Sequence, residues 1–501
     1  MNPIKKLFSQ TAVYGLTTII GRLLNYLLVP LYTYHFPPQD YGVVTELYAY
    51  AVLLQILLTY GMETGYFRFS EKNYTSDQVF STAFSSLFTT STIFVITILY
   101  FSKPIADFLG YSNHVDYIVF LAIILGTDAV SAIFFARLRQ QNKVWTFAGM
   151  KILNILLNIG FNLYFILLCP KLYAHSPHSF LCSFYNPHIG VGYIFISNLI
   201  ASVTIFVLFL PTLIKIKYRP SVRLLLSMLA YSLPLLITGL TGAVNEVADR
   251  IMLKFLTVVP PGVQNAHEYV MYQLGIYGAN AKIAVIMMLF VQAFRYAAEP
   301  FYFSYAKEAD HKEVFADVMK FYIILGVGIF LFVMLFLDVI KYFISPRYFS
   351  GLKIVFPLLW SRLLVGVFFL LSFWYKLTDR THYGIVIFFI GAVITLVMNY
   401  LLIPKYGYVS CAWTNFTTYL TMVTISLLWG KKYLPVKYDF KTIFFYIGLG
   451  LALYFGFKFI TRGIESWHKY LFSVLFLSVY FVVVLTREHL WQRLRFLPRK
   501  L

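Results

Sequence analysis

The 501-residue chain carries a formal net charge of +20 at pH 7, yet only 12% of its residues are charged and 59% are hydrophobic. A mean hydropathy of +0.72 excludes an ordinary soluble globular protein. The basic residues are spread over short connections between hydrophobic runs, and they form no soluble basic module of the kind that binds nucleic acid. We therefore expect a membrane protein that has no nucleic-acid partner.

Hydrophobic runs fill the chain almost from end to end. A helix needs about 20 apolar residues to cross a bilayer. Fourteen runs approach or exceed this length, at 11–31, 42–67, 79–101, 115–136, 146–168, 189–214, 230–257, 275–303, 320–340, 354–374, 383–403, 409–429, 441–460 and 469–486. The predicted fold class is an all-α polytopic membrane protein with about 14 transmembrane helices.

The basic residues between the runs alternate in a way that predicts the orientation. With Lys5 and Lys6 in the cytoplasm, most other Lys and Arg also fall in cytoplasmic connections, at 137–143, 215–223 and 431–441 and in the tail after 486. This distribution follows the positive-inside rule. An even number of spans then places both termini in the cytoplasm. The first run is expected to remain as a membrane helix, because no small-residue cleavage site follows it.

A weak internal repeat divides the runs into two sets of six. Residues 14–17 (YGLT) match 238–241 (TGLT), the Tyr-Gly pair at 41–42 matches the pair at 277–278, and Asn162 matches Asn399. Such repeats are typical of transporters whose two halves rock around a shared site. The predicted organisation is two pseudo-symmetric six-helix bundles around a central cavity, at 1–220 and 221–432, with two additional helices and a basic cytoplasmic tail at 433–501.

Prolines within or beside the runs are expected to bend helices or to free backbone carbonyls. They are Pro30, Pro234, Pro300 and Pro357.

The runs contain an unusual set of ionisable residues. A charge at the centre of a membrane helix costs about 2.5–3.5 kcal/mol or more, so it persists where it faces protein or water. The set comprises Arg22, Glu46, Glu63, Asp128, Lys151, Glu246, Asp249, Arg250, Lys282, Arg295, Glu299 and Arg362. One interpretation is a polar substrate pathway. The other is structural: Glu246 with Arg250, and Arg295 with Glu299, are four residues apart and could pair within one helix.

The signs of these charges suggest what the pathway would carry. Arg22, Arg250, Lys282, Arg295 and Arg362 are candidates for binding phosphate, because a guanidinium suits oxyanions. The acids Glu46, Glu63, Glu246, Glu299 and Asp128 are candidates for coupling to H⁺ or Na⁺. Asn25, Asp249, Asn158 and Asn162 complete the candidate substrate-binding set. Asn154, Asn158 and Asn162 form a stripe that serves either helix packing or contact with sugars.

Enzyme chemistry finds no support in the sequence. The chain has no phosphate-binding loop, nucleophile elbow, Gly-rich dinucleotide turn or metal-ligand spacing. We expect no catalytic residue, metal or cofactor.

Several ordered motifs resemble one family. They are Gly15-Leu16-Thr17, Gly21-Arg22 and Val29-Pro30-Leu31-Tyr32-Thr33 in the first run, Asp40-Tyr41-Gly42, Asp249-Arg250, Tyr277-Gly278, Gln292-Ala293-Phe294 with Pro300-Phe301, and the segment 399–407 (NYLLIPKYG). Together they resemble the bacterial polysaccharide repeat-unit flippases of the multidrug/oligosaccharidyl-lipid/polysaccharide (MOP) exporter superfamily. The resemblance covers the first twelve runs, and the last two agree only in number.

The resemblance implies translocation of an undecaprenyl-diphosphate-linked oligosaccharide across the bacterial cytoplasmic membrane by alternating access. It implies lipid-linked oligosaccharide and the bilayer as partners, with H⁺ or Na⁺, a polysaccharide polymerase and glycosyltransferases as further candidates. Arg22, Asp249 and Arg250 match charged positions of the family, whereas Arg295 and Glu299 depart from its pattern. Two alternatives stay open: an ion-coupled multidrug exporter of the same superfamily, and a non-transporting scaffold of a polysaccharide-synthesis complex.

Overall fold

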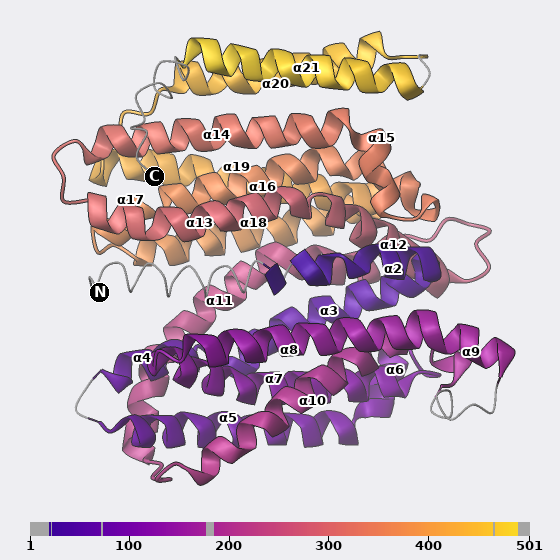
Figure 1. Cartoon of the computed structure of the whole chain (residues 1–501), viewed down its shortest axis with the longest axis vertical. Coiled ribbons are helices and arrows are strands. Elements are labelled where there is room, and N and C mark those ends of the chain that lie inside the picture. The colour runs from indigo at the N-terminus through magenta and orange to yellow at the C-terminus, as the bar shows by residue number, and fades with distance from the viewer. Residues whose placement is uncertain (1–19, 22, 72–73, 177–184, 464–465, 489–501) are drawn as a thin grey trace. The chain divides into compact units, whose positions relative to one another are not determined.

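Helices make up every regular element that the structure describes. The computed structural model describes residues 20–21, 23–71, 74–176, 185–463 and 466–488 (Figure 1). Within these residues, 11 helices are long and apolar enough to cross a membrane, and a bent pair raises the number of spans to 12. The predicted class, an all-α polytopic membrane protein, is confirmed.

The predicted number of fourteen spans stays a prediction. About half of the run 11–31, residues 11–19 and 22, falls outside the described residues. The run 409–429 forms helix α19 (Tyr408–Tyr433), which is not among the helices apolar enough to count as a span.

The chain groups into two compact units by spatial proximity. Unit 1 comprises residues 1–279 and 392–411, and unit 2 comprises residues 280–391 and 412–501. The segment 392–411 joins unit 1 through Thr395, whose hydroxyl donates to Asn245 Oδ1 at 3.3 Å, and through Cys411, whose thiol lies 3.8 Å from the Asp249 carbonyl. The predicted division at 220 and 432, and the two-fold symmetry, remain predictions.

Unit 1 is built around α7. Its elements are α2 (Leu28–His35), α3 (Pro38–Thr59), α4 (Met62–Ser70), α5 (Ser76–Tyr100), α6 (Ser102–Phe108), α7 (Val115–Gln140), α8 (Val144–Leu163) with a π-turn (Tyr164–Leu168), α9 (Cys169–His175), a 3-10 turn (Pro187–Ile189), α10 (Gly192–Ile214), α11 (Val222–Leu256) and most of α12 (Ala266–Ile283). Helix α7 packs against α3, α5 and α10, and α11 packs against α3 and α4. Buried rings hold this core together: Phe134 lies 5.3 Å from Phe80 and 5.0 Å from Phe209 between ring centroids.

Unit 2 is built around α14 (His311–Leu335). Its other elements are α13 (Val285–Tyr305), α15 (Leu337–Ile340), the 3-10 turns η4 (Lys341–Phe343) and η5 (Pro346–Ile354), α16 (Val355–Leu371), α17 (Phe373–Leu377), the first part of α18 (His382–Tyr406), most of α19, α20 (Phe440–Ile460) and α21 (Ser466–Arg487). Helix α14 packs against α16, α20 and α21 (Figure 1). The buried Tyr480 hydroxyl donates to the Ile324 carbonyl at 2.8 Å and ties α21 to α14.

Two predicted spans are broken, and neither break is at a proline. The run 42–67 divides into α3 and α4 at Tyr60 and Gly61, whose φ angles of 32° and 70° are left-handed. The run 275–303 forms α12 and α13, bent by 47° about Ala284, and α12 begins at residue 266. Helices α11 and α13 continue through Pro234 and Pro300. Pro30 and Pro357 lie in first turns, where a missing N–H costs little.

Candidate functional site in unit 1

A polar cavity of about 710 Å³ lies among the helices of unit 1. Helices α3, α4, α7, α8 and α10 contribute its walls. Its polar lining residues are Tyr48, Gln55, Glu63, Asp128, Ser131, Arg139, Lys151, Asn154 and Asn198. Because all five helices belong to candidate membrane spans, polar side chains within them are expected to gather where they share one polar space. The volume falls within the range of small-molecule binding sites.

The four charges of this cavity differ in how they are satisfied. Arg139 Nη2 forms an ion pair with Glu63 Oε2. Lys151 lies over the Phe135 ring, with Nζ 4.0 Å from the ring centroid. No ion pair within 4 Å joins Asp128 or Lys151 to another described residue. The cavity therefore presents one acid and one base that are not neutralised by a close ion pair within the described part of the chain.

A second cluster surrounds Glu46, whose side chain is fully buried. Lys254 Nζ lies 2.6 Å from Glu46 Oε1 and donates to the Leu109 carbonyl at 2.6 Å. The Tyr111 hydroxyl donates to Glu46 Oε2. Burial first, and then the Glu46 carboxylate, raises the pKa of Tyr111 well above its usual value, so the phenol stays a donor. This cluster joins α3, α11 and the turn after α6.

A third cluster lies on α11 and α12. Asp249 Oδ1 accepts from the Arg250 backbone N–H at 2.8 Å and pairs with Arg250 Nη1 at 3.0 Å. The Tyr277 hydroxyl donates to Asp249 Oδ2. Arg250 Nη1 also donates to the Glu246 carbonyl. Nε and Nη2 of Arg250 have no hydrogen-bond partner among the described residues, so part of the guanidinium remains available to a ligand.

The asparagines of α8 form a hydrogen-bonded chain. Asn162 Oδ1 accepts from the Tyr32 hydroxyl at 3.0 Å, and Asn162 Nδ2 donates to Asn158 Oδ1 at 3.1 Å. Asn158 Nδ2 donates to Asn25 Oδ1 at 3.2 Å. These contacts tie α8 to Tyr32 of α2 and to Asn25 just before α2, which favours the packing interpretation of the stripe at Asn158 and Asn162. Asn154 instead lines the cavity.

The candidates in unit 2 are more dispersed. Glu299 pairs with Lys376 at 3.8 Å rather than with Arg295. The Arg295 guanidinium stacks over the Phe369 ring at 4.7 Å. Arg362 is half-buried in α16.

Of the remaining candidates, Lys282 is exposed on α12, Glu246 is exposed on α11, and Arg22 lies outside the described residues.

The predicted intrahelical pairs are therefore replaced by other partners. Arg250 pairs with its neighbour Asp249, and Glu299 with Lys376 of another helix. Sequence reasoning also missed Lys254, Tyr111 and Arg139. A buried carboxylate such as Glu46 needs a basic partner, so its position within an apolar run predicts a nearby Lys or Arg. The sequence does not identify which Lys or Arg is that partner.

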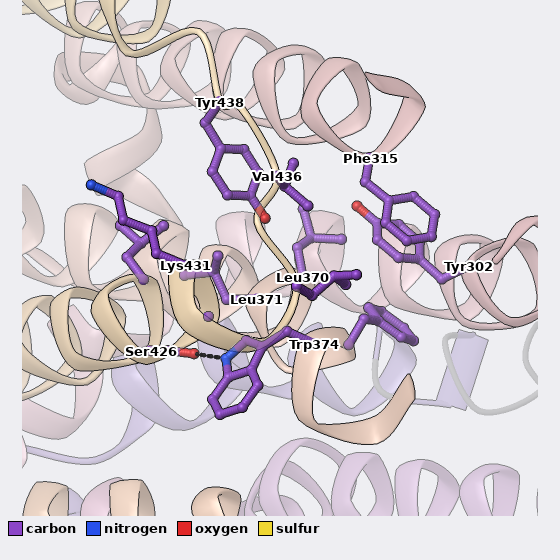
Figure 2. Close-up of a pocket in the computed structure, with 13 residues that line it drawn as sticks. Tyr302, Phe315, Leu370, Leu371, Trp374, Ser426, Lys431, Val436 and Tyr438 are labelled. Atoms are coloured by element: carbon purple, nitrogen blue, oxygen red, sulfur yellow. Dashed lines mark hydrogen bonds between the residues drawn. The ribbon is translucent and has the colours of Figure 1, made fainter. Parts of the chain in front are cut away.

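The described part of the chain provides no metal site, and a small pocket in unit 2 provides no room for a substrate. Among the described residues, no group of three or more His, Cys, Asp or Glu side chains is placed to hold a metal ion. A small pocket in unit 2, between Tyr302, Phe315 and Trp374, holds about 20 Å³, enough for one water molecule (Figure 2). There Trp374 Nε1 donates to Ser426 Oγ at 3.0 Å, which is a packing contact.

The comparisons with known proteins agree with this architecture. The solved structure of the lipid II flippase MurJ in an inward closed conformation superposes with a TM-score of 0.71 at 14% identity, covering 95% of this chain and 99% of that one. An inward-facing multidrug resistance MATE family transporter of the MOP superfamily gives 0.62 at 14% identity, covering 82% and 94%. A MOP superfamily transporter from Pyrococcus furiosus Vc1, described as having a binding pocket of reversed polarity, gives 0.53 at 13% identity, covering 84% and 95%.

These similarities establish a fold shared with transporters of the MOP superfamily. No curated protein sequence matches the chain closely enough to count as a relative. The family model described as polysaccharide biosynthesis protein matches residues 7–305, more than half of the chain. The chain belongs to the polysaccharide biosynthesis protein family.

Proposed function

We propose that this protein is a flippase that moves undecaprenyl-diphosphate-linked oligosaccharide repeat units across the bacterial cytoplasmic membrane by alternating access. The family match carries the proposal, because it links a transporter fold to polysaccharide biosynthesis. A glycan bears many hydroxyl groups, and each costs several kcal/mol in hydrocarbon when it is left unpaired. A lipid-linked glycan therefore needs a polar path through the bilayer.

The polar cavity of unit 1 supports this function as a binding region for part of the polar head group. Its uncharged polar groups, such as Gln55, Asn154 and Asn198, suit sugar hydroxyls. Lys151 is placed to attract an anionic group, and Arg250 offers free guanidinium donors for a phosphate. Arg22 is a further candidate from the sequence.

Asp128 is the leading candidate for coupling within the described residues. It faces the same cavity as Lys151 and has no close ion pair there, so binding H⁺ or Na⁺ would change the balance of charge that the head group meets. Glu63 has a partner in Arg139, and Glu46 has one in Lys254, which makes both better suited to holding helices together. A polymerase and glycosyltransferases are proposed partners.

To test this proposal, Lys151 and Asp128 are replaced by neutral residues in cells whose own copy of the gene has been deleted. Lys151→Gln should reduce surface polysaccharide and raise inner-leaflet lipid-linked oligosaccharide. We expect an effect of about 10- to 100-fold, which corresponds to about 1.5–3 kcal/mol for a hydrogen bond to a charged group. Ser131→Ala, which lines the same cavity without charge, is the matched control. Wild-type transport by both Lys151→Gln and Asp128→Asn, at wild-type protein levels, would refute the assignment of this cavity.

The multidrug-exporter alternative keeps support from the fold it shares with MATE transporters. It predicts that expression raises resistance to cationic dyes and that Asp128→Asn abolishes this resistance. The scaffold alternative predicts that deleting the gene impairs polysaccharide synthesis, whereas Lys151→Gln and Asp128→Asn leave it at the wild-type level. The three functions thus give different results with the same strains.

A further inference from the structure

A groove of about 1050 Å³ opens in unit 2, and none of the charged residues discussed above lines it. It lies where α14 and α20 end and where α16 and α21 begin, and these helices are packed side by side (Figure 1). The proposed function makes no use of it.

Aromatic side chains form the apolar part of the groove. The Phe356 ring lies 5.6 Å from Tyr454, 6.3 Å from Phe455 and 6.5 Å from Trp413 between centroids. Phe455 is 55% exposed and Trp413 is 45% exposed, so about half of each side chain is left open by the described part of the chain. Such a surface is suited to contact with hydrocarbon.

The charges of the groove are strongly unbalanced. Four cations line it, Lys353 from η5, Lys458 from the last turn of α20, Arg462 from the turn that follows α20, and Lys469 from α21, against one acid, Asp338. Asp338 is already engaged, by Lys341 at 2.8 Å and by Lys469 at 3.9 Å. Lys458 and Arg462 both line the groove, and neither forms an ion pair with a described residue. An anionic ligand complements this charge.

The position along α20 identifies the kind of anion. Helix α20 has 21 residues and is a candidate membrane span. At 1.5 Å per residue it is about 31 Å long, close to the hydrocarbon thickness of a bilayer. Its last turn, which carries Lys458, therefore lies at the depth of lipid head groups, where the phosphates of phospholipids are concentrated.

We propose that this groove binds an anionic phospholipid. The phosphate contacts Lys458 and Arg462, and an acyl chain lies along Phe356 and Phe455. Single cations and aromatic residues at span ends commonly anchor helices at the interface. Here four cations, from η5, α20, the turn after α20 and α21, line one large hollow, which an anchoring role does not require.

Native mass spectrometry of the full-length protein in detergent, titrated with phosphatidylglycerol and with phosphatidylcholine, tests the proposal. We expect phosphatidylglycerol to bind at least 10-fold more tightly, and Lys458→Gln with Arg462→Gln to remove this preference. Lys405→Gln is the matched control, because Lys405 is an exposed cation in the last turn of α18 outside the groove. The charge-preserving Lys458→Arg should bind as the wild type does.

Three results would overturn the proposal. One is equal affinity for the two lipids, which would mean that only acyl chains are recognised. Another is an equal loss of binding in Lys405→Gln, which would indicate nonspecific charge. The third is full displacement of the lipid by millimolar inorganic phosphate, which would indicate a site for the free anion. If the double variant unfolds, Arg462→Gln alone should still weaken phosphatidylglycerol binding several-fold.

Discussion

At the scale of single residues, the membrane charges of unit 1 fall into two kinds. Glu46 and Asp249 are almost fully buried, and each accepts from a base and from a tyrosine hydroxyl. Asp128 and Lys151 face the cavity, and neither forms a close ion pair with another described residue. A buried charge that keeps its partners holds helices in place, whereas one that faces a polar space is free to meet a ligand or an ion.

The Glu46 cluster yields a prediction about stability. Lys254→Met leaves a buried carboxylate without its counter-charge, so the free energy of unfolding should fall by about 3–5 kcal/mol. Restoring neutrality with Glu46→Gln in the same chain should recover most of the loss. Thermal denaturation in detergent measures both, with Lys103→Met, an exposed lysine on α6, as control. A loss in Lys254→Met no larger than in the control would contradict the role of the pair.

The Arg250 side chain yields a prediction about transport. Its guanidinium is held by Asp249 through Nη1 alone. Arg250→Lys keeps the charge but loses the planar fork that suits phosphate. Transport should therefore fall by about 10-fold, since a bidentate contact to a charged group is worth about 1.5–3 kcal/mol, whereas the protein should remain folded. Unchanged transport at equal protein levels would exclude Arg250 from the substrate path.

At the scale of elements, glycines allow α3 and α12 to approach each other closely. A Cβ on Gly42 would overlap the Met271 carbonyl, and a Cβ on Gly275 would overlap the Pro38 carbonyl. Gly278, part of the second Tyr-Gly pair of the internal repeat, would meet the Thr45 side chain. The Tyr-Gly pairs noticed in the sequence thus have a structural role in this contact, as small residues commonly have between membrane helices.

Gly275→Ala should disturb this contact. Because the obstacle is backbone, the helices must separate, at a cost of about 1–3 kcal/mol. Gly149→Ala on α8, where no atom lies within 4 Å of the new methyl group, should be neutral or slightly stabilising. The amount of folded protein in the membrane and its melting temperature measure the difference. Equal behaviour of the two variants would refute the close approach of α3 and α12.

The elements also show what the sequence could reveal. Membrane helices such as α5, α7 and α14 follow from local composition, because a long apolar run has few alternatives to a helix in lipid. The break at Tyr60 and Gly61 depends on left-handed backbone angles, which a continuous apolar run conceals. Partners such as Glu46 and Lys254 are 208 residues apart in sequence, so only the packing of α3 on α11 brings them together.

At the scale of the whole molecule, the family and the fold support the proposed movement of a lipid-linked glycan. The chain belongs to a polysaccharide biosynthesis family and has a fold shared with MOP superfamily transporters. Its net charge of +20 at pH 7 is consistent with a positive-inside distribution of Lys and Arg between the membrane helices. Turnover of the lipid-linked glycan distinguishes transport from a scaffold role.

The most direct measurement is therefore transport by the purified protein in liposomes. Lipid-linked oligosaccharide from the native cell is placed in one leaflet, and its arrival in the other is followed with a membrane-impermeant glycan label. We expect the wild type to move the lipid at a rate that a proton or sodium gradient increases, and Lys151→Gln to be slower by at least about 10-fold. No movement of the glycan lipid by active protein, together with gradient-driven movement of a cationic dye, would contradict it.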